Sequence, residues 1–296
     1  MEANVMKIRK WMIVVAGILV IFSAVWSLIE RRKMLAQTSS RYVVLMERFD
    51  QKIIASKRAE KKMYPASMTK IMTTLVALEQ ITDEEKTVEM PNEIVAAAKN
   101  QGASTAGFSG GDTVTIRDLL YGIMLPSGAE CCYRIGRYLD GSEQKFVERM
   151  NQKAEELGMK HTHFSNMTGL HAEDHYTTAK DMVLLLDHAL KNKRFRKIFT
   201  SMTYRTSPGK AFPSGRILYS TLFQYRDQLK LNNGDYLGGK TGYTSEAGLC
   251  LASFAKVNGK EYVLITAGAD GDHETKPYHV MDAGKIFQRL SETAEK

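Results

Sequence analysis

The chain has 296 residues, of which 44% are hydrophobic and 25% charged, as in a globular protein with one large or two small domains. Its formal net charge is +8, but residues 1–33 carry +4 of this, so the rest of the chain is only weakly basic. The chain has neither an arginine-rich run nor a basic stripe, which excludes an electrostatic nucleic-acid binder of the usual kind.

Near the N-terminus, the stretch WMIVVAGILVIFSAVWSLI (residues 11–29) contains no charged residue. As a helix it would span roughly 28 Å, close to the thickness of a bilayer core. It is longer than a typical signal-peptide core, and no clear A-x-A cleavage site follows it. We therefore expect a short basic segment (1–10) and then a retained transmembrane anchor in the cell membrane, with the body of the protein outside the cytoplasm. The alternative is a cleaved signal and secretion.

Beyond a polar linker (30–41), strands are predicted at both ends of the chain and helices between them. Asn258-Gly259 separates two apolar runs and is a strong hairpin signal. We expect an α+β fold in which the two terminal regions form one antiparallel sheet, with helices against it and a helical subdomain between them. The expected strands are 42–57 (a pair), 238–244, 248–257 and 260–270, and the expected helices are 67–81, 116–125, 129–139, 142–158, 178–191 and 279–296.

Three cysteines, Cys131, Cys132 and Cys250, do not make a disulfide framework, because the number is odd and two of them are adjacent. We expect them to be small buried apolar side chains.

The pattern S-x-x-K occurs four times, and only its context separates the copies. Ser253 and Lys256 fall in a predicted strand, where this spacing puts the two side chains on opposite faces. Ser207 precedes a Pro-Gly turn, and Ser142 is expected to cap a helix. The remaining copy, Ser67–Lys70, begins the apolar helix 67–81.

In a helix, residues three apart share a face, so the Lys70 amine can reach the Ser67 hydroxyl. Serine becomes a good nucleophile when a base accepts its proton, and a lysine can do so when burial and a second cation favour its neutral form. The stretch GGKTGYT (238–244) offers that cation in Lys240. Lys240 and Thr241 are candidates for binding a carboxylate, and Gly242 allows a substrate backbone to come close.

The stretch LPSGAE (125–130) lies between two predicted helices. Its Ser127 is a candidate for passing a proton to a leaving amine, although PSG alone is also an ordinary turn.

Together, YPASMTK, LLYGIMLPSG and GGKTGYTSEAG resemble the S-x-x-K, S-x-N and K-T-G motifs of the penicillin-binding serine enzymes, in the same order. The flanking sequence, including FSNMTGLHAEDHYTTAKDM (164–182), is most similar to the D-alanyl-D-alanine carboxypeptidases of the low-molecular-mass penicillin-binding group. The resemblance covers roughly residues 40–290 and implies a β-lactamase/transpeptidase-like catalytic domain at 42–296.

For function, the resemblance implies a peptidoglycan stem peptide as substrate and β-lactams as covalent inhibitors, without a metal or organic cofactor. Ser67 would attack the carbonyl between two D-Ala residues, with Lys70 as base and Ser127 as proton relay. Lys240 and Thr241 would hold the terminal carboxylate. Gly242 would admit the substrate backbone, and the N–H groups of Ser67 and Tyr243 would bind the oxyanion.

Two features depart from the family pattern. The second motif reads Ser127-Gly128-Ala129 and so lacks its usual asparagine; either the substrate's peptide group loses a partner, or Glu130 or a water replaces it. Too few residues follow Gly242 for the extra β domain and C-terminal anchor of many relatives, so we expect residues 11–29 to do the anchoring.

Other functions stay open at this stage. GFSGG (107–111) matches the G-x-S-x-G motif but lacks the flanking strand and helix, and a catalytic triad with His171 or His175 cannot be established from spacing. A metalloprotease with metal ligands among His161, His163, His171 and His175 is another alternative, but the sequence lacks the H-E-x-x-H motif. A β-lactamase-like hydrolase and a weakly catalytic penicillin-binding sensor are two further alternatives, because both would also use a serine nucleophile activated by a lysine.

Overall fold

The computed structural model describes residues 11, 17, 29, 32–209 and 212–293. The chain divides into two units, residues 1–37 and 38–296, and the architecture described here is that of the second. Most of the expected anchor, residues 11–29, lies outside the described residues. Among those that are described, no helix combines the length and the apolar character needed to cross a membrane.

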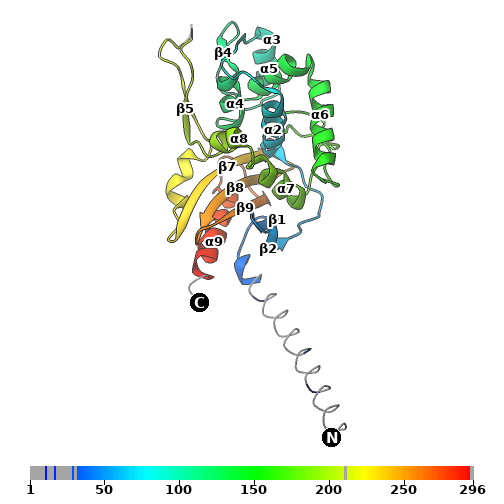
Figure 1. Ribbon diagram of the computed structural model, residues 1–296, viewed down its shortest axis with the longest axis vertical. Helices are drawn as coiled ribbons and strands as arrows, with labels where there is room; N and C mark the ends of the chain where they lie inside the picture. The colour runs from blue at the N-terminus through cyan, green and yellow to red at the C-terminus, as the bar shows by residue number, and fades with distance from the viewer. Residues whose placement is uncertain (1–10, 12–16, 18–28, 30–31, 210–211, 294–296) are drawn as a thin grey trace. The chain divides into compact units, whose positions relative to one another are not determined.

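A five-stranded antiparallel sheet is the framework of the molecule, with strand order β2-β1-β9-β8-β7 (Figure 1). The two ends of the chain meet in it, because β1 pairs with β9, and this confirms the expected sheet. Asn258 and Gly259 have positive φ angles at the β8–β9 turn, as a two-residue hairpin requires. The strands are β1 (Tyr42–Glu47), β2 (Lys52–Lys57), β7 (Gly234–Thr244), β8 (Gly248–Val257) and β9 (Lys260–Ala269).

The helices fill the middle of the chain, and most of them lie on one side of the sheet, whereas α9 packs on β8 and β9 (Figure 1). The predicted cap residue Ser142, and Thr178 at the start of the expected helix 178–191, accept hydrogen bonds from the first turns of α6 and α7. The helices are η1 (Ala66–Thr69), α2 (Lys70–Gln80), α3 (Asn92–Asn100), α4 (Ile116–Met124), α5 (Ala129–Asp140), α6 (Glu143–Glu156), α7 (Ala179–Ala189), α8 (Lys193–Phe199), η2 (Phe223–Leu229) and α9 (Tyr278–Glu292). Two pairs of short antiparallel strands also occur: β3 (Thr87–Glu89) with β4 (Thr113–Thr115), which α3 separates in the chain, and β5 (Thr203–Arg205) with β6 (Ile217–Tyr219).

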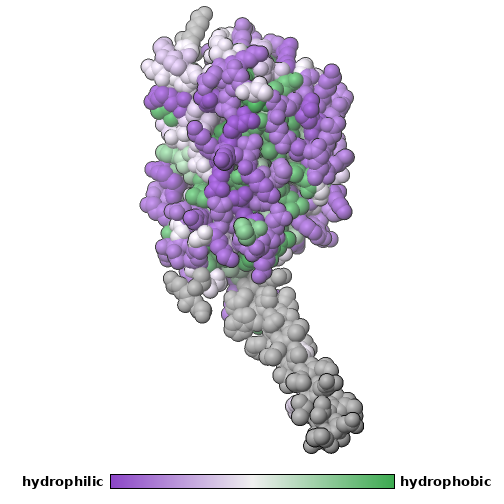
Figure 2. Space-filling model, viewed as in Figure 1, coloured by the Kyte–Doolittle hydropathy of each residue, from purple (hydrophilic) through white to green (hydrophobic). Residues whose placement is uncertain are grey.

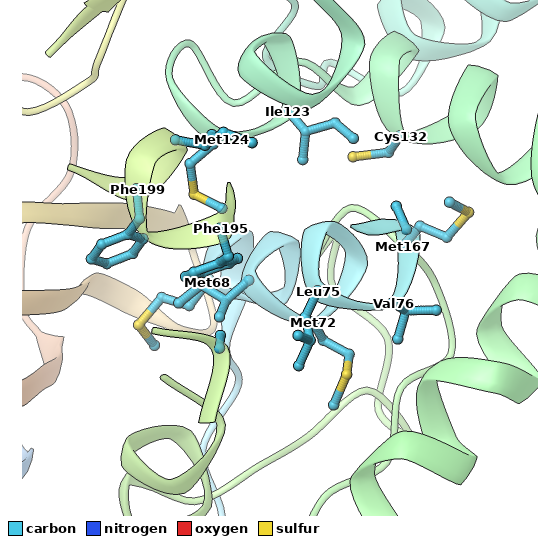
Figure 3. Close-up of a cluster of buried hydrophobic side chains, with 14 of the residues drawn as sticks. Met68, Met72, Leu75, Val76, Ile123, Met124, Cys132, Met167, Phe195 and Phe199 are labelled. Atoms are coloured by element: carbon cyan, nitrogen blue, oxygen red, sulfur yellow. The ribbon is translucent and has the colours of Figure 1, made fainter. Parts of the chain in front are cut away.

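Helix α2 is the centre of the core, and nine of its eleven residues are buried. Figure 3 shows its apolar side chains among those of α4, α8 and the segment around Met167. The surface in the view of Figure 2 is mostly hydrophilic, as expected when apolar side chains pack inside. Because α2 is packed over most of its surface, residues at its N-terminal end are held on a rigid support.

Candidate active site

The predicted nucleophile stands where η1 leads into α2. The sequence suggested one helix over 67–81, but the first turn, Ala66–Thr69, is a 3₁₀ turn, and the α-helix begins at Lys70. Ala66 has a φ of +46°, a left-handed conformation that is costly for a residue with a side chain. The tight turn keeps Ser67 partly exposed while Lys70 is buried.

Lys70 is in contact with the Ser67 hydroxyl. Its Nζ donates to Ser67 Oγ at 3.1 Å and to the carbonyl oxygen of Thr168 at 2.6 Å. Burial lowers the pKa of Lys70, because desolvation disfavours the ammonium form. A serine hydroxyl therefore lies within hydrogen-bond reach of an amine whose neutral form is more accessible than in water.

The stretch Lys240–Tyr243 lies on β7, the strand expected at 238–244, and β7 is an edge strand of the sheet. Lys240 is fully buried, and its Nζ donates to the carbonyl oxygen of Thr241 at 2.9 Å. Burial, assisted by the positive charge of Lys70, holds the pKa of Lys240 well below its ordinary value. The Thr241 hydroxyl shares a 2.6 Å hydrogen bond with that of Thr221.

Gly242 brings β7 against the backbone of the nucleophile. A Cβ atom at this position would lie 2.9 Å from the backbone nitrogen of Ser67 and 3.2 Å from that of Met68. Only a glycine permits this separation without displacing one of the two segments. Ser67 and Tyr243, the residue after Gly242, line the same cleft as a result.

Ser127 lies in the connection between α4 and α5, with a φ of +67°. Its side chain is almost fully buried, and within the described part of the chain its Oγ has no hydrogen-bond partner. A buried hydroxyl without a hydrogen-bond partner is energetically unfavourable, so Ser127 Oγ is available to bind a substrate or a water.

Glu130 does not fill the role of the missing asparagine in this geometry. Its side chain is fully buried, and its Oε1 accepts the N–H groups of Ala106 at 2.7 Å and Gly107 at 3.0 Å. Burial raises the pKa of this carboxyl group. Glu130 therefore holds the segment preceding α4, where the Ser104 carbonyl accepts the N–H of Ala129 at 2.8 Å.

Five of the seven predicted site residues line one cleft of about 120 Å³: Ser67, Ser127, Thr241, Gly242 and Tyr243. Lys70 and Lys240 are buried beside them and complete the set. Sequence patterns did not indicate the other lining residues, because most of them come from loops and from η2, and the remaining two, Leu249 on β8 and His279 on α9, stand in no recognised motif. The other lining residues are Ser104, Thr221, Gln224, Tyr225, Leu249, Asp272, His273, Thr275, Pro277 and His279.

The side chains behind the competing hypotheses do not assemble into another site. Ser109 of GFSGG lies in a loop, as expected, where its N–H donates to Asp112. His175 contacts Thr69 rather than Ser67, and His171 lies 3.9 Å from Glu246. In the part of the chain that is described, no group of three or more His, Cys, Asp or Glu residues could hold a metal ion.

The sequence also matches known proteins over most of its length. The family described as D-alanyl-D-alanine carboxypeptidase (Peptidase_S11) matches residues 30–271. The chain is 35% identical over 237 residues to D-alanyl-D-alanine carboxypeptidase DacF of Bacillus subtilis, covering 78% of this chain but only 58% of DacF. It is 32% identical over 242 residues to the D-alanyl-D-alanine carboxypeptidase of Streptomyces sp. strain K15, covering 78% of this chain and 80% of that protein.

Solved structures agree with these matches. A mutant of the Streptomyces K15 DD-transpeptidase superposes with a TM-score of 0.77 at 26% identity, covering 86% of this chain and 98% of the other. The fold is thus that of the DD-transpeptidases, an antiparallel sheet with helices around it. The chain belongs to the D-alanyl-D-alanine carboxypeptidase family of serine peptidases.

Proposed function

We propose that this protein is a serine D-Ala-D-Ala carboxypeptidase that removes the terminal D-Ala from peptidoglycan stem peptides and is acylated by β-lactams. The observation that carries the proposal is the 3.1 Å contact between Lys70 Nζ and Ser67 Oγ, in a cleft that β7 closes on the other side. The matching family and the relative from Bacillus subtilis are both described as D-alanyl-D-alanine carboxypeptidases, which supports the same substrate.

In the acylation step, neutral Lys70 accepts the Ser67 proton while its own N–H continues to donate to Thr168. The Ser67 oxygen attacks the carbonyl carbon of the scissile peptide bond, and the N–H groups of Ser67 and Tyr243 stabilise the oxyanion. The C–N bond then breaks, and the departing D-Ala amine takes up the proton by way of Ser127. Water later attacks the ester and regenerates the Ser67 hydroxyl, so no cofactor is consumed.

Thr241 is the group on β7 best placed to bind the substrate carboxylate, because its hydroxyl is on the cleft wall. Lys240 is buried next to this residue, so its charged form, which a bound carboxylate would favour, would act through the protein rather than by an exposed ammonium group. A buried charge close to the site acts more strongly than one in water, because the surrounding dielectric is low.

The decisive experiment is covalent labelling of the purified protein with a fluorescent penicillin, followed by mass spectrometry of the labelled peptide. We expect the label on Ser67 and its loss in Lys70→Ala. The matched control is Ser142→Ala, which alters a serine with the same S-x-x-K spacing whose hydroxyl only caps α6. A label on Ser109 or Ser127 would contradict the proposal.

A second candidate function, a penicillin-binding sensor with weak catalysis, is favoured by Ala129, which has no amide to bind a substrate. Release of D-Ala from a peptide ending in D-Ala-D-Ala separates the two functions, because a sensor would be labelled without releasing D-Ala. Rapid hydrolysis of the penicillin would indicate a β-lactamase-like enzyme instead. Activity that a chelator abolishes would contradict every serine mechanism considered.

We also propose that residues 11–29 anchor the protein in the cell membrane and place the catalytic domain outside the cytoplasm. The nineteen uncharged residues and their flanking basic residues support this. The full chain should stay in the membrane fraction after an alkaline carbonate wash, whereas a chain lacking residues 1–33 should not. N-terminal sequencing of the mature protein would reveal cleavage and secretion, the alternative.

A further inference from the structure

The position of the Lys70 amine depends on a turn that is remote from it in sequence. The Thr168 carbonyl accepts the shorter of the two Lys70 hydrogen bonds, at 2.6 Å. The next residue, Gly169, packs so tightly that a Cβ atom there would collide with the Ala66 carbonyl oxygen. A shift of this turn would therefore move the amine and the nucleophile's backbone together.

Asn166 gives the turn its shape. Its Oδ1 accepts the N–H groups of Thr168 at 3.1 Å and Gly169 at 2.8 Å, and its Nδ2 donates to the carbonyl oxygen of Leu170 at 2.9 Å. These bonds aim the Thr168 carbonyl but do not attach the turn to the rest of the site.

Two side-chain contacts make that attachment: Thr73 Oγ1 on α2 donates to the Met167 carbonyl at 2.7 Å, and His175 joins the turn to Thr69. The Nδ1 of His175 accepts the N–H groups of Ser165 at 3.0 Å and Asn166 at 3.4 Å, and its Nε2 is 2.8 Å from Thr69 Oγ1. Because two N–H donors point at Nδ1, that nitrogen must be unprotonated, and the ring hydrogen is then on Nε2 and donated to Thr69. The ring is 1% exposed and packs edge-on against Phe164.

We propose that His175 is a positioning residue for acylation, which couples the 165–169 turn through Thr69 to the chain between Ser67 and Lys70. This rests on the proposed function, because it assumes Ser67 as nucleophile and Lys70 as base. The ring touches neither of them directly. It sets the distance and direction from which Lys70 meets the Ser67 hydroxyl.

This role requires a neutral imidazole, because a proton on Nδ1 would face two N–H donors. Burial lowers the pKa of His175 to about 4, against a smaller opposite effect of Asp174. The other charged or titratable neighbours are His163 and His171 on the adjoining segments and Lys70 on α2, and all three disfavour a charged ring.

The test measures the rate of penicillin acylation of the full-length protein between pH 5 and 9. His175→Ala should lower the rate by about tenfold or more, since small misplacements of catalytic groups are costly. It should also move the acid limb of the profile to lower pH, because protonated Lys70 loses a well-aligned acceptor. Thr69→Val, which removes only the hydroxyl, should act in the same direction more weakly. His175→Gln should recover part of the rate, since an amide offers both an acceptor and a donor.

The matched control is His163→Ala, a histidine of the same segment whose Nδ1 contacts only the Asp174 carbonyl among the hydrogen bonds described. It should leave rate and profile unchanged. Wild-type rates in His175→Ala and Thr69→Val would overturn the inference. The inference would also be overturned if the loss of acylation rate only matched the loss of folded protein, measured by thermal melting, and the acid limb of the pH profile did not move. If the wild-type protein acquires no label on Ser67, the proposed function itself fails, which is a distinct result.

Discussion

Replacing Gly242 with alanine tests whether β7 and the nucleophile form one site. The added Cβ would lie 2.9 Å from Ser67 N and 3.1 Å from Ala66 Cβ, whereas ordinary contacts begin at 3.4 Å. One segment must therefore recede by about 0.5 Å to restore normal contact. Overpacking of this kind costs ~1–3 kcal/mol of stability. We expect acylation to slow by roughly 10- to 100-fold, because the displaced N–H groups are those assigned to the oxyanion.

The assay is the second-order rate of labelling by fluorescent penicillin, at a temperature where melting curves show both proteins folded. Gly209→Ala is the matched control, since among the described residues its Cβ would meet only the Thr113 carbonyl oxygen, at an ordinary 3.6 Å. It should label at the wild-type rate. A folded Gly242→Ala variant that also labels at the wild-type rate would refute the assigned oxyanion site and the closeness of β7 to Ser67.

Two further predictions concern buried titratable groups. Burial raises the pKa of Cys132 and Cys250 to about 12, and that of Cys131 well above its ordinary value. The native protein should therefore consume almost no Ellman's reagent at pH 8 and three equivalents when unfolded; rapid reaction of the native protein would contradict the burial. Burial also lowers the pKa of His175 and His279 to about 4. The unfolded chain then binds more protons between pH 6.5 and 4, so the free energy of unfolding should fall as pH drops through this window, by on the order of 3 kcal/mol per histidine at most. Urea titrations measure the free energy of unfolding of the wild type and of His279→Gln across this pH window. An equal loss of stability on acidification in the two proteins would contradict the prediction.

The sheet and most helices could be predicted because their signals are local. The Asn258-Gly259 turn, the caps Ser142 and Thr178, and the apolar stripe of α2 each depend on residues within a few positions of one another. Helices α3 and α8 and the β5–β6 hairpin were not predicted. They are short or highly charged, so packing against the rest of the chain decides their structure more than periodicity does.

The candidate site could be predicted only in part, for a related reason. Ser67, Lys70, Ser127 and the residues of β7 stand in three short motifs that can be read directly from the chain. The contact of Lys70 with Thr168 could not be found in this way, because its acceptor is a backbone carbonyl that every residue type carries. The supporting role of Glu130 depends on a loop 24 residues away, so no local pattern indicates it.

The proposed reaction needs the two buried lysines in different protonation states, with Lys70 neutral and Lys240 charged, although both lie in the same site. Burial lowers both pKa values, and the charge of Lys70 lowers that of Lys240 further. Because the two ammonium groups repel, protonation of either lysine favours the neutral form of the other. A carboxylate bound at Thr241 would favour charged Lys240 and hence neutral Lys70, the form able to accept the Ser67 proton.

Substrate binding and activation of the nucleophile should therefore be linked. A peptide ending in D-Ala-D-Ala amide cannot supply the negative charge, so it should lose kcat as well as affinity, and more so at low pH, where Lys70 is harder to deprotonate. Steady-state release of the terminal residue from the acid and amide peptides compares them. An amide that raises KM while leaving kcat unchanged at every pH would show that the carboxylate contributes binding alone, and that the charges of Lys240 and Lys70 are independent.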